Sequence, residues 1–105
     1  MNIVGISACT SGIAHTYIAK EKLIKVGQQF GHTVHIETQG TIGIEDELTQ
    51  QQIKEADLVI IAADIKVSGK ERFKGKKVIE IPTNIAIKAP KQLYKKIEEE
   101  LNANK

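Results

Sequence analysis

The sequence predicts an α/β protein with an open parallel sheet of about four strands and helices on both faces. Segments with strand character alternate with segments of helical periodicity along the chain of 105 residues, which favours strand–helix–strand units with right-handed crossovers. The stretch Leu58–Ala63 contains six consecutive apolar residues, as expected of a central strand that is covered on both faces. The stretch from Ile3 onward is also apolar with little polar alternation, so we expect a second buried strand there.

The first strand is expected at Ile3–Cys9, and a long helix should follow it. Gly5 lies inside the strand and favours a position where a neighbouring backbone comes close. The helix should span Ile13–Phe30, and Gly31 suits the C′ position that ends a helix. Residues suited to burial repeat every three or four positions on one face of this helix, namely Thr16, Ala19, Leu23, Val26 and Phe30.

A second strand and a short helix are predicted in the middle of the chain. In Thr33–Thr38, apolar and polar residues alternate as they do near the edge of a sheet. A loop with glycines follows at Gln39–Glu47. Thr49 is then a suitable N-cap for a short helix, and Gln52 stands where a capping box requires a glutamine or glutamate.

The last elements follow the central strand. Asp64 closes that strand, and a final strand is expected at Val78–Ile81, ended by Pro82, which cannot continue a ladder of hydrogen bonds. Pro90 suits the first turn of a final helix. In that helix an apolar residue recurs every four positions, at Leu93, Ile97 and Leu101.

Composition indicates a single folded domain over residues 1–105. Hydrophobic residues make up 41% and charged residues 27% of the chain, which is ordinary for a globular protein and argues against disorder. A net charge of +2, with two tyrosines, two phenylalanines and no tryptophan, argues against a nucleic-acid surface. A single cysteine cannot form an internal disulfide, and we see neither a signal peptide nor an apolar segment near the ~20 residues of a membrane span. We therefore expect a cytoplasmic protein without direct membrane insertion.

The residues that carry chemistry lie between the first strand and the first helix. Cys9, the only cysteine, stands at the carboxyl edge of the predicted sheet, where open α/β sheets bind ligands. Thr10, Ser11 and Gly12 are small and can turn tightly, so that successive backbone N–H groups converge on an anion over the sulfur. A helix that begins near Ile13 points the positive end of its dipole at Cys9, which favours the nucleophilic thiolate.

The carboxyl ends of the other strands supply further candidates at the same edge. A lone cysteine in a small domain is more often an inert core residue, and it is the position of Cys9 that makes it a candidate nucleophile. Parallel strands end at one edge, so Thr38, Gln39 and Gly40 after the second strand and Asp64 after the central strand should lie near Cys9.

The histidines do not predict a metal site. His15 falls in the first turn of the first helix, where we favour contact with a bound phosphoryl group over a purely structural bond. His32 and His35 lie near the start of the second strand, at the opposite edge from Cys9. We therefore predict no metal ion, and nothing in the sequence calls for a cofactor.

An ordered set of motifs resembles one known family over nearly the whole chain. The motifs are Cys9–Thr16 (CTSGIAHT), Glu37–Gly40 (ETQG), Ala56–Asp57 leading into Ile60–Asp64, and Arg72–Phe73. Together they resemble the IIB component of the fructose-family sugar phosphotransferase system. The family loop usually reads Cys-Pro-Thr-Gly, where this chain has Thr10 and Ser11.

The resemblance implies a fold, a chemistry and partners. The family fold is a Rossmann-like, three-layer domain whose parallel strands lie in the order 2-1-3-4. Cys9 would accept a phosphoryl group from a phosphohistidine on a IIA protein or domain and pass it to a sugar, expected to be fructose, bound by a membrane IIC permease. The protein would then act at the inner face of the membrane through its permease partner. The implied phosphate-binding loop consists of Thr10, Ser11, Gly12, Ile13, Ala14, His15 and Thr16.

Two other classes of function are open on the residues alone. A low-molecular-weight tyrosine phosphatase also has a cysteine loop after its first strand, but it carries an arginine at the sixth position after the cysteine, where this chain has His15. The chain also lacks an Asp-Pro pair for the usual general acid. A binding module for an anionic ligand would use the same loop with Cys9 as a spectator. Phosphoryl transfer depends mainly on positioning and on donors around the equatorial oxygens, which favours the relay over the hydrolase.

Overall fold

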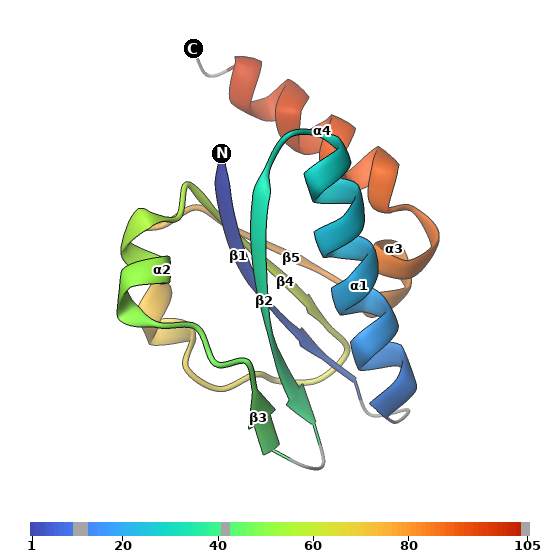
Figure 1. The fold of residues 1–105 in the computed structure, drawn as a ribbon, viewed down its shortest axis with the longest axis vertical. Coiled ribbons are helices and arrows are strands. Elements are labelled where there is room, and N and C mark those ends of the chain that lie inside the picture. The colour runs from blue at the N-terminus through green and yellow to red at the C-terminus, as the bar shows by residue number, and fades with distance from the viewer. Residues whose placement is uncertain (10–12, 41–42, 104–105) are drawn as a thin grey trace.

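The computed structural model describes residues 1–9, 13–40 and 43–103 and contains a five-stranded sheet with helices on both faces (Figure 1). This confirms the predicted α/β class. The elements in chain order are β1 (Asn2–Ala8), α1 (Ile13–Gln29), β2 (Thr33–Gly40), β3 (Gly43–Glu45), α2 (Gln50–Glu55), β4 (Leu58–Ala63), the 3-10 helix η1 (Lys70–Phe73), β5 (Val78–Ile81), α3 (Thr83–Lys88) and α4 (Pro90–Ala103).

The sheet is mixed and has one strand more than predicted, so the prediction of four strands that are all parallel is not confirmed. The strand order is β3-β2-β1-β4-β5, in which β2, β1, β4 and β5 are parallel and β3 is antiparallel to β2. The extra strand lies inside the segment Gln39–Glu47, which the sequence predicts as a loop. It is only three residues long and exposed throughout, so it shows no apolar pattern. Because β3 pairs with Thr38–Gly40, β2 also runs two residues beyond its predicted end.

The helices form two layers around the sheet, each with its own core. Helices α1, α3 and α4 cover one face, and α2 and η1 cover the other (Figure 1). The first core gathers residues such as Ile3, Leu23, Val34, Ile60 and Tyr94. The second gathers Val4, Ile6, Leu48, Ile53, Ile61 and Phe73. Neighbouring strand residues such as Ile3 and Val4 therefore serve opposite faces, as the period of a strand requires.

Helix α1 begins at its predicted residue, ends one residue before its predicted end and buries most of its predicted face. Of the predicted face, Phe30 is partly buried and packs against the first core, whereas four residues are buried, namely Thr16, Ala19, Leu23 and Val26. The helix ends in a Schellman motif around Gly31, which has a positive φ of 86°. The N–H of His32 bonds to the carbonyl of Gly27, and the N–H of Gly31 bonds to that of Gln28.

Gly5 occupies the close approach that the sequence predicts. A Cβ atom at this position would lie 2.2 Å from the backbone oxygen of Ile60 on β4. A similar approach occurs at Gly27, where an added Cβ would lie 2.7 Å from the hydroxyl oxygen of Tyr94. That hydroxyl donates a hydrogen bond of 2.7 Å to the carbonyl of Leu23 and so ties α4 to α1.

The predicted capping box of α2 is present, whereas α3 and η1 are not predicted. The Thr49 side chain accepts from the N–H of Gln52, and the Gln52 side chain accepts from the N–H of Thr49. Helix α3 has only six residues and η1 only four. Segments this short carry too few repeats for a helical period to be visible in the sequence.

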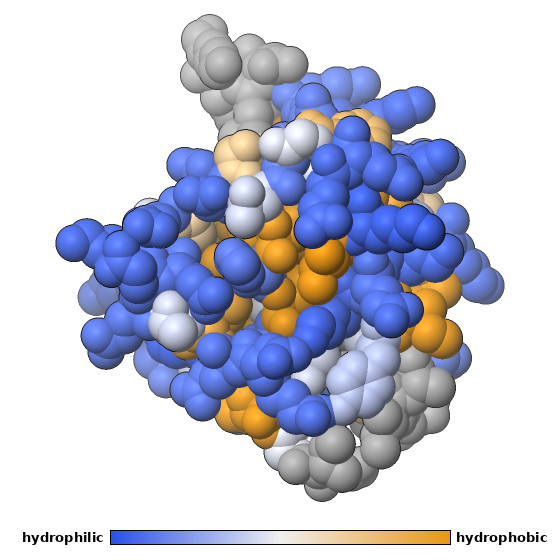
Figure 2. Space-filling model, viewed as in Figure 1, coloured by the Kyte–Doolittle hydropathy of each residue, from blue (hydrophilic) through white to orange (hydrophobic). Residues whose placement is uncertain are grey.

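The surface is mostly hydrophilic on the face shown in Figure 2, with apolar residues gathered in a furrow near its middle. A cavity of about 360 Å³ between α1, β2 and the segment before α2 is lined in part by Ile24, Val34 and Ile36. The furrow lies beside the part of β2 that the short strand β3 leaves uncovered.

Candidate functional site

Cys9 and Asp64 lie side by side at the carboxyl edge of the sheet. Ala8 of β1 pairs with Ala63 of β4, so the next residue of each strand emerges at the same level. The Cys9 side chain is only 6% exposed. Its Sγ donates a hydrogen bond of 3.2 Å to Oδ2 of Asp64. The parallel register therefore brings together two of the residues that the sequence predicts for this edge.

Thr83, the first residue of α3, holds the Asp64 carboxylate in place. Its N–H donates to Oδ1 at 3.0 Å, and its hydroxyl donates to Oδ2 at 2.5 Å. These bonds, with smaller contributions from Cys9 and from the charge of His15, hold the pKa of Asp64 below its ordinary value of 3.8 even though desolvation opposes them. Asp64 is thus a fixed negative charge beside the sulfur at neutral pH.

The start of α1 lies beside the carboxyl end of β1, the strand that Cys9 follows (Figure 1). The predicted turn residues Thr10, Ser11 and Gly12 lie outside the described residues, as do the side chains of Ile13 and Ala14. The backbone of α1 begins at Ile13, four positions after Cys9. The positive end of a helix of 17 residues therefore lies beside the cysteine.

The two predicted residues in the first turn of α1 differ in burial. His15 is exposed, whereas Thr16 is 3% exposed. The carbonyl of Thr16 accepts a hydrogen bond of 2.8 Å from the hydroxyl of Ser7, which is fully buried in β1. This bond fixes the start of the helix relative to the strand that carries Cys9.

An open cavity of about 460 Å³ lies on the other side of Cys9. Its lining residues come from the ends of β1 and β2, from β3 and from the segment after β4, and they are Cys9, Gln39, Gly40, Gly43, Ile44, Ile65 and Ser68. The predicted edge residues Gln39 and Gly40 are therefore brought to Cys9. Thr38 does not line this cavity, and its buried hydroxyl has no hydrogen-bond partner in the part of the chain that is described.

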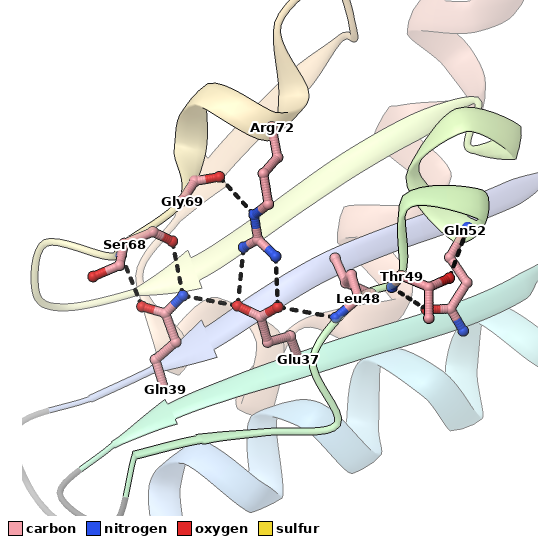
Figure 3. Close-up of polar contacts among 8 residues, drawn as sticks. All are labelled: Glu37, Gln39, Leu48, Thr49, Gln52, Ser68, Gly69 and Arg72. Atoms are coloured by element: carbon pink, nitrogen blue, oxygen red, sulfur yellow. Dashed lines mark hydrogen bonds and ion pairs between the residues drawn. The ribbon is translucent and has the colours of Figure 1, made fainter.

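Glu37, whose side chain is buried, and the partly exposed Arg72 form an ion pair next to Gln39, which lines this cavity (Figure 3). Glu37 is fully buried, and its carboxylate accepts two bonds from the Arg72 guanidinium, at 2.8 and 3.0 Å. It also accepts from the side-chain amide of Gln39 at 2.8 Å and from the N–H of Leu48 at 3.0 Å. Burial raises the pKa of Glu37, but these hydrogen bonds together outweigh it and leave the pKa below its ordinary value of 4.5. Glu37 is therefore ionised and fully bonded.

Several of these roles are not visible in the sequence. Ser7 is the one hydroxyl-bearing residue in a strand that, after Asn2, is otherwise apolar, and that irregularity is a signal that sequence reasoning can use. Thr83 directly follows Pro82 after the last strand, on the predicted edge. Glu37 and Arg72 both belong to recognised motifs, but nothing in the sequence pairs them across 35 positions.

The described residues contain neither a candidate metal site nor a candidate membrane-spanning helix. Within residues 1–9, 13–40 and 43–103, no group of three histidine, cysteine, aspartate or glutamate side chains is placed to hold a metal ion. His32 and His35 lie at the start of β2, away from the edge that carries Cys9. Among the helices formed by these residues, none is both long and apolar enough to cross a bilayer.

A cysteine at the carboxyl edge of a parallel sheet, directly before a helix, defines a class of small α/β domain suited to covalent chemistry on an anionic group. The profile of one family, described as the lactose/cellobiose-specific IIB subunit of the phosphotransferase system (PTS), matches residues 4–96. The chain belongs to this family of IIB components, which are phosphoryl-transferring subunits of sugar phosphotransferase systems.

Relatives and solved structures agree with this assignment. The chain is 41% identical over 99 residues to the PTS system fructose-like EIIB component 2 of Escherichia coli K12, covering 94% of this chain and 93% of that protein. It is 40% identical over 94 residues to the fructose-specific EIIABC component of Bacillus subtilis, covering 90% of this chain but 15% of that protein. The solution structure of an Enzyme IIB subunit from E. coli K12 superposes with a TM-score of 0.91 at 36% identity, covering 98% of this chain and 95% of that one.

Proposed function

We propose that Cys9 carries the phosphoryl group, which it receives from a phosphohistidine on a IIA protein or domain and passes to a sugar bound by a IIC permease. The observation that carries the proposal is the position of Cys9. It is the only thiol, it directly follows β1 at the carboxyl edge of the sheet, and α1 begins four positions later.

Each step of the proposed relay exchanges one bond to phosphorus for another. In the first step the Cys9 sulfur attacks phosphorus, the S–P bond forms, and the N–P bond breaks with its electron pair returning to the imidazole of the donor, which takes up the proton that the thiol loses. In the second step a sugar hydroxyl oxygen attacks phosphorus, the S–P bond breaks to return the electron pair to sulfur, and the hydroxyl proton passes to the sulfur to restore the thiol. We propose that the N–H groups at the start of α1 and in the Thr10–Thr16 loop bind the phosphoryl oxygens in both steps.

The names of the relatives support the choice of partners and sugar. The B. subtilis relative is named as a fusion of A, B and C components, and a relative in Vibrio cholerae, 46% identical over 90 residues, is named as a fructose-specific EIIB'BC component. Covalent fusion of these components in relatives supports IIA and IIC partners for this chain, a place at the inner face of the membrane beside the permease, and a fructose-type sugar.

The relay predicts a phosphoprotein that persists until its acceptor arrives. Hydrolysis of phosphocysteine requires a positioned water and a base. The near carboxylate, Asp64, already accepts two bonds from Thr83, one from its N–H and one from its hydroxyl. We therefore expect the isolated phosphoprotein to decay slowly and to lose its phosphoryl group rapidly when membranes containing the permease and fructose are added.

The matching test for a phosphatase uses para-nitrophenyl phosphate. Multiple turnovers that Cys9→Ser abolishes would contradict the relay and favour the phosphatase. Replacing His15 by arginine should raise residual hydrolysis if the absent guanidinium separates the two families. Under the relay, the mass of the protein rises by one phosphate group, and prior alkylation of Cys9 with iodoacetamide prevents that rise. A simple anion-binding module would show no such rise.

A further inference from the structure

We infer that Gln39 is a positioning residue that shapes the cavity beside Cys9 for the protein that donates the phosphoryl group, and that the buried Glu37–Arg72 pair holds it there. The inference rests on the proposed function of Cys9. It concerns the side of Cys9 formed by β2 and β3.

The side-chain amide of Gln39 is held at both ends (Figure 3). Its nitrogen donates to Oε2 of Glu37 at 2.8 Å and to the carbonyl of Ser68 at 2.9 Å. Its oxygen accepts from the N–H of Ser68 at 2.8 Å. Both amide hydrogens are therefore used. Gln39 joins the end of β2 to the segment after β4, and both segments line the cavity with Cys9.

The ion pair behind Gln39 provides a rigid support. Arg72 bonds to both oxygens of Glu37, and its Nε donates to the carbonyl of Gly69 at 2.8 Å. These contacts join β2 to η1, and the bond from Leu48 adds the segment before α2. Well-packed apolar residues can stabilise a core as well as a buried ion pair does. Stability alone therefore does not explain why Glu37 and Arg72 are charged residues. The need to hold the Gln39 side chain in one orientation does explain it.

The side of the cavity formed by β3 is also held in place, by contacts with α1. Strand β3 supplies Gly43 and the half-exposed Ile44, 49% accessible. Next to them, Glu45 accepts a hydrogen bond from the hydroxyl of Tyr17, and Asp46 pairs with Lys20. Both contacts tie β3 to α1. The cavity therefore has two fixed walls with Cys9 between them.

The lining fits a protein side chain better than a sugar. Isoleucines and glycines make up four of the seven lining residues in the described part of the chain, and the amide hydrogens of Gln39 are already used. These walls therefore offer few hydrogen-bond partners for the several hydroxyl groups of a sugar. A flat imidazole ring presents fewer polar atoms to them. The volume of about 460 Å³ also exceeds what a phosphoryl group alone needs.

The test compares the two half-reactions in Gln39→Met, which keeps the length of the side chain and removes its hydrogen bonds. The donor is a fructose-type IIA domain carrying radiolabelled phosphohistidine, and the acceptor is a membrane vesicle containing a fructose permease, with fructose. We expect KM for the phosphorylated donor to rise about ten-fold. Transfer onward to fructose and the rate of Cys9 alkylation by iodoacetamide should both stay within about two-fold of the wild type.

The matched control is Lys70→Gln, which breaks an exposed ion pair in the same short helix. Lys70 contacts Glu80 at 2.6 Å, and both side chains are about half exposed. Exposed pairs of this kind contribute little, so both half-reactions should be unchanged. Arg72→Lys should reproduce the rise in KM, because an ammonium group cannot hold both oxygens of Glu37.

Each other result overturns the inference. An unchanged KM for the donor would mean that Gln39 does not position it. A defect confined to onward transfer would mean that the cavity serves the sugar or its permease, and altered alkylation would mean that Gln39 acts on Cys9 itself. If Gln39→Met does not fold, Arg72→Lys gives the same readings. Failure of the wild type to accept any phosphoryl group would instead overturn the proposed function.

Discussion

Replacing Glu37 by glutamine tests the buried ion pair most sharply. The glutamine oxygen can still accept from Arg72 Nη1 and from the N–H of Leu48. The glutamine NH₂ group would replace Oε2, where Arg72 Nη2 and the Gln39 amide now donate at 3.0 and 2.8 Å. The N–H donors of Arg72 and Gln39 would then both face the NH₂ group of the new glutamine, which is itself a donor. Each lost bond to a charged group is worth about 1.5–3 kcal/mol, and breaking a buried pair costs about 3–5 kcal/mol.

We therefore expect Glu37→Gln to lower the free energy of unfolding by about 3–5 kcal/mol at neutral pH, as measured by urea denaturation. For a domain of this size that corresponds to a fall in Tm of about 12–20 °C. The control is Glu80→Gln, which removes the carboxylate of an exposed pair and should change stability by at most about 1 kcal/mol.

The same variant gives a dependence on pH with a definite sign. The pKa of Glu37 lies below its ordinary value of 4.5 in the folded protein, so the unfolded chain binds the proton more readily. The stabilisation by Glu37 is then complete above pH 4.5 and is lost as the pH falls through the folded pKa. The difference in free energy of unfolding between the wild type and Glu37→Gln should therefore become smaller in acid. A gap below about 1 kcal/mol at neutral pH, or one that stays constant in acid, would refute this reasoning.

Three further substitutions test other contacts. Gly5→Ala places a methyl group 2.2 Å from a carbonyl oxygen of β4 and should force the two central strands apart, so thermal unfolding should show a loss of more than about 3 kcal/mol; a change under about 1 kcal/mol would contradict the close approach. Thr83→Val removes the hydroxyl that bonds Asp64, so the pKa of Asp64 followed by NMR should rise toward 3.8, and an unchanged value would contradict the assigned bond. Tyr94→Phe leaves a buried carbonyl of α1 without its 2.7 Å donor and should cost about 1–3 kcal/mol in urea denaturation, whereas no loss would mean that the bond does not contribute.

The elements that the sequence predicts well have a long or mostly apolar pattern or, like Val78–Ile81, end at a proline. Leu58–Ala63 and Val78–Ile81 have the predicted bounds, and α1 ends one residue before its predicted end. The elements that it misses are short. The strand Gly43–Glu45 is exposed and gains its hydrogen bonds only because β2 lies beside it. Pairing of this kind depends on the assembled sheet and leaves no local pattern.

The candidate site divides in the same way. The contact between Cys9 and Asp64 follows from parallel strands that end at one edge, so the sequence predicts that these two residues lie close together. The pairing of Glu37 with Arg72 depends on how η1 packs against β2, and sequence spacing does not contain that information. The sequence predicts Gln39 at the edge of the sheet. It does not predict the two hydrogen bonds between Gln39 and Ser68, which join the end of β2 to the segment after β4.

Locating the phosphoryl group in the charged protein tests the central claim most directly. Wild type and Cys9→Ser are incubated with phosphoenolpyruvate, the general phosphotransferase proteins and a fructose-type IIA domain, and phosphorus NMR and tandem mass spectrometry then identify the modified residue. We predict a single S–P linkage at Cys9 in the wild type and no label in the folded serine variant, because a serine hydroxyl is not ionised near neutral pH. A phosphoryl group on His15 or Ser11, or a labelled Cys9→Ser variant, would contradict the account.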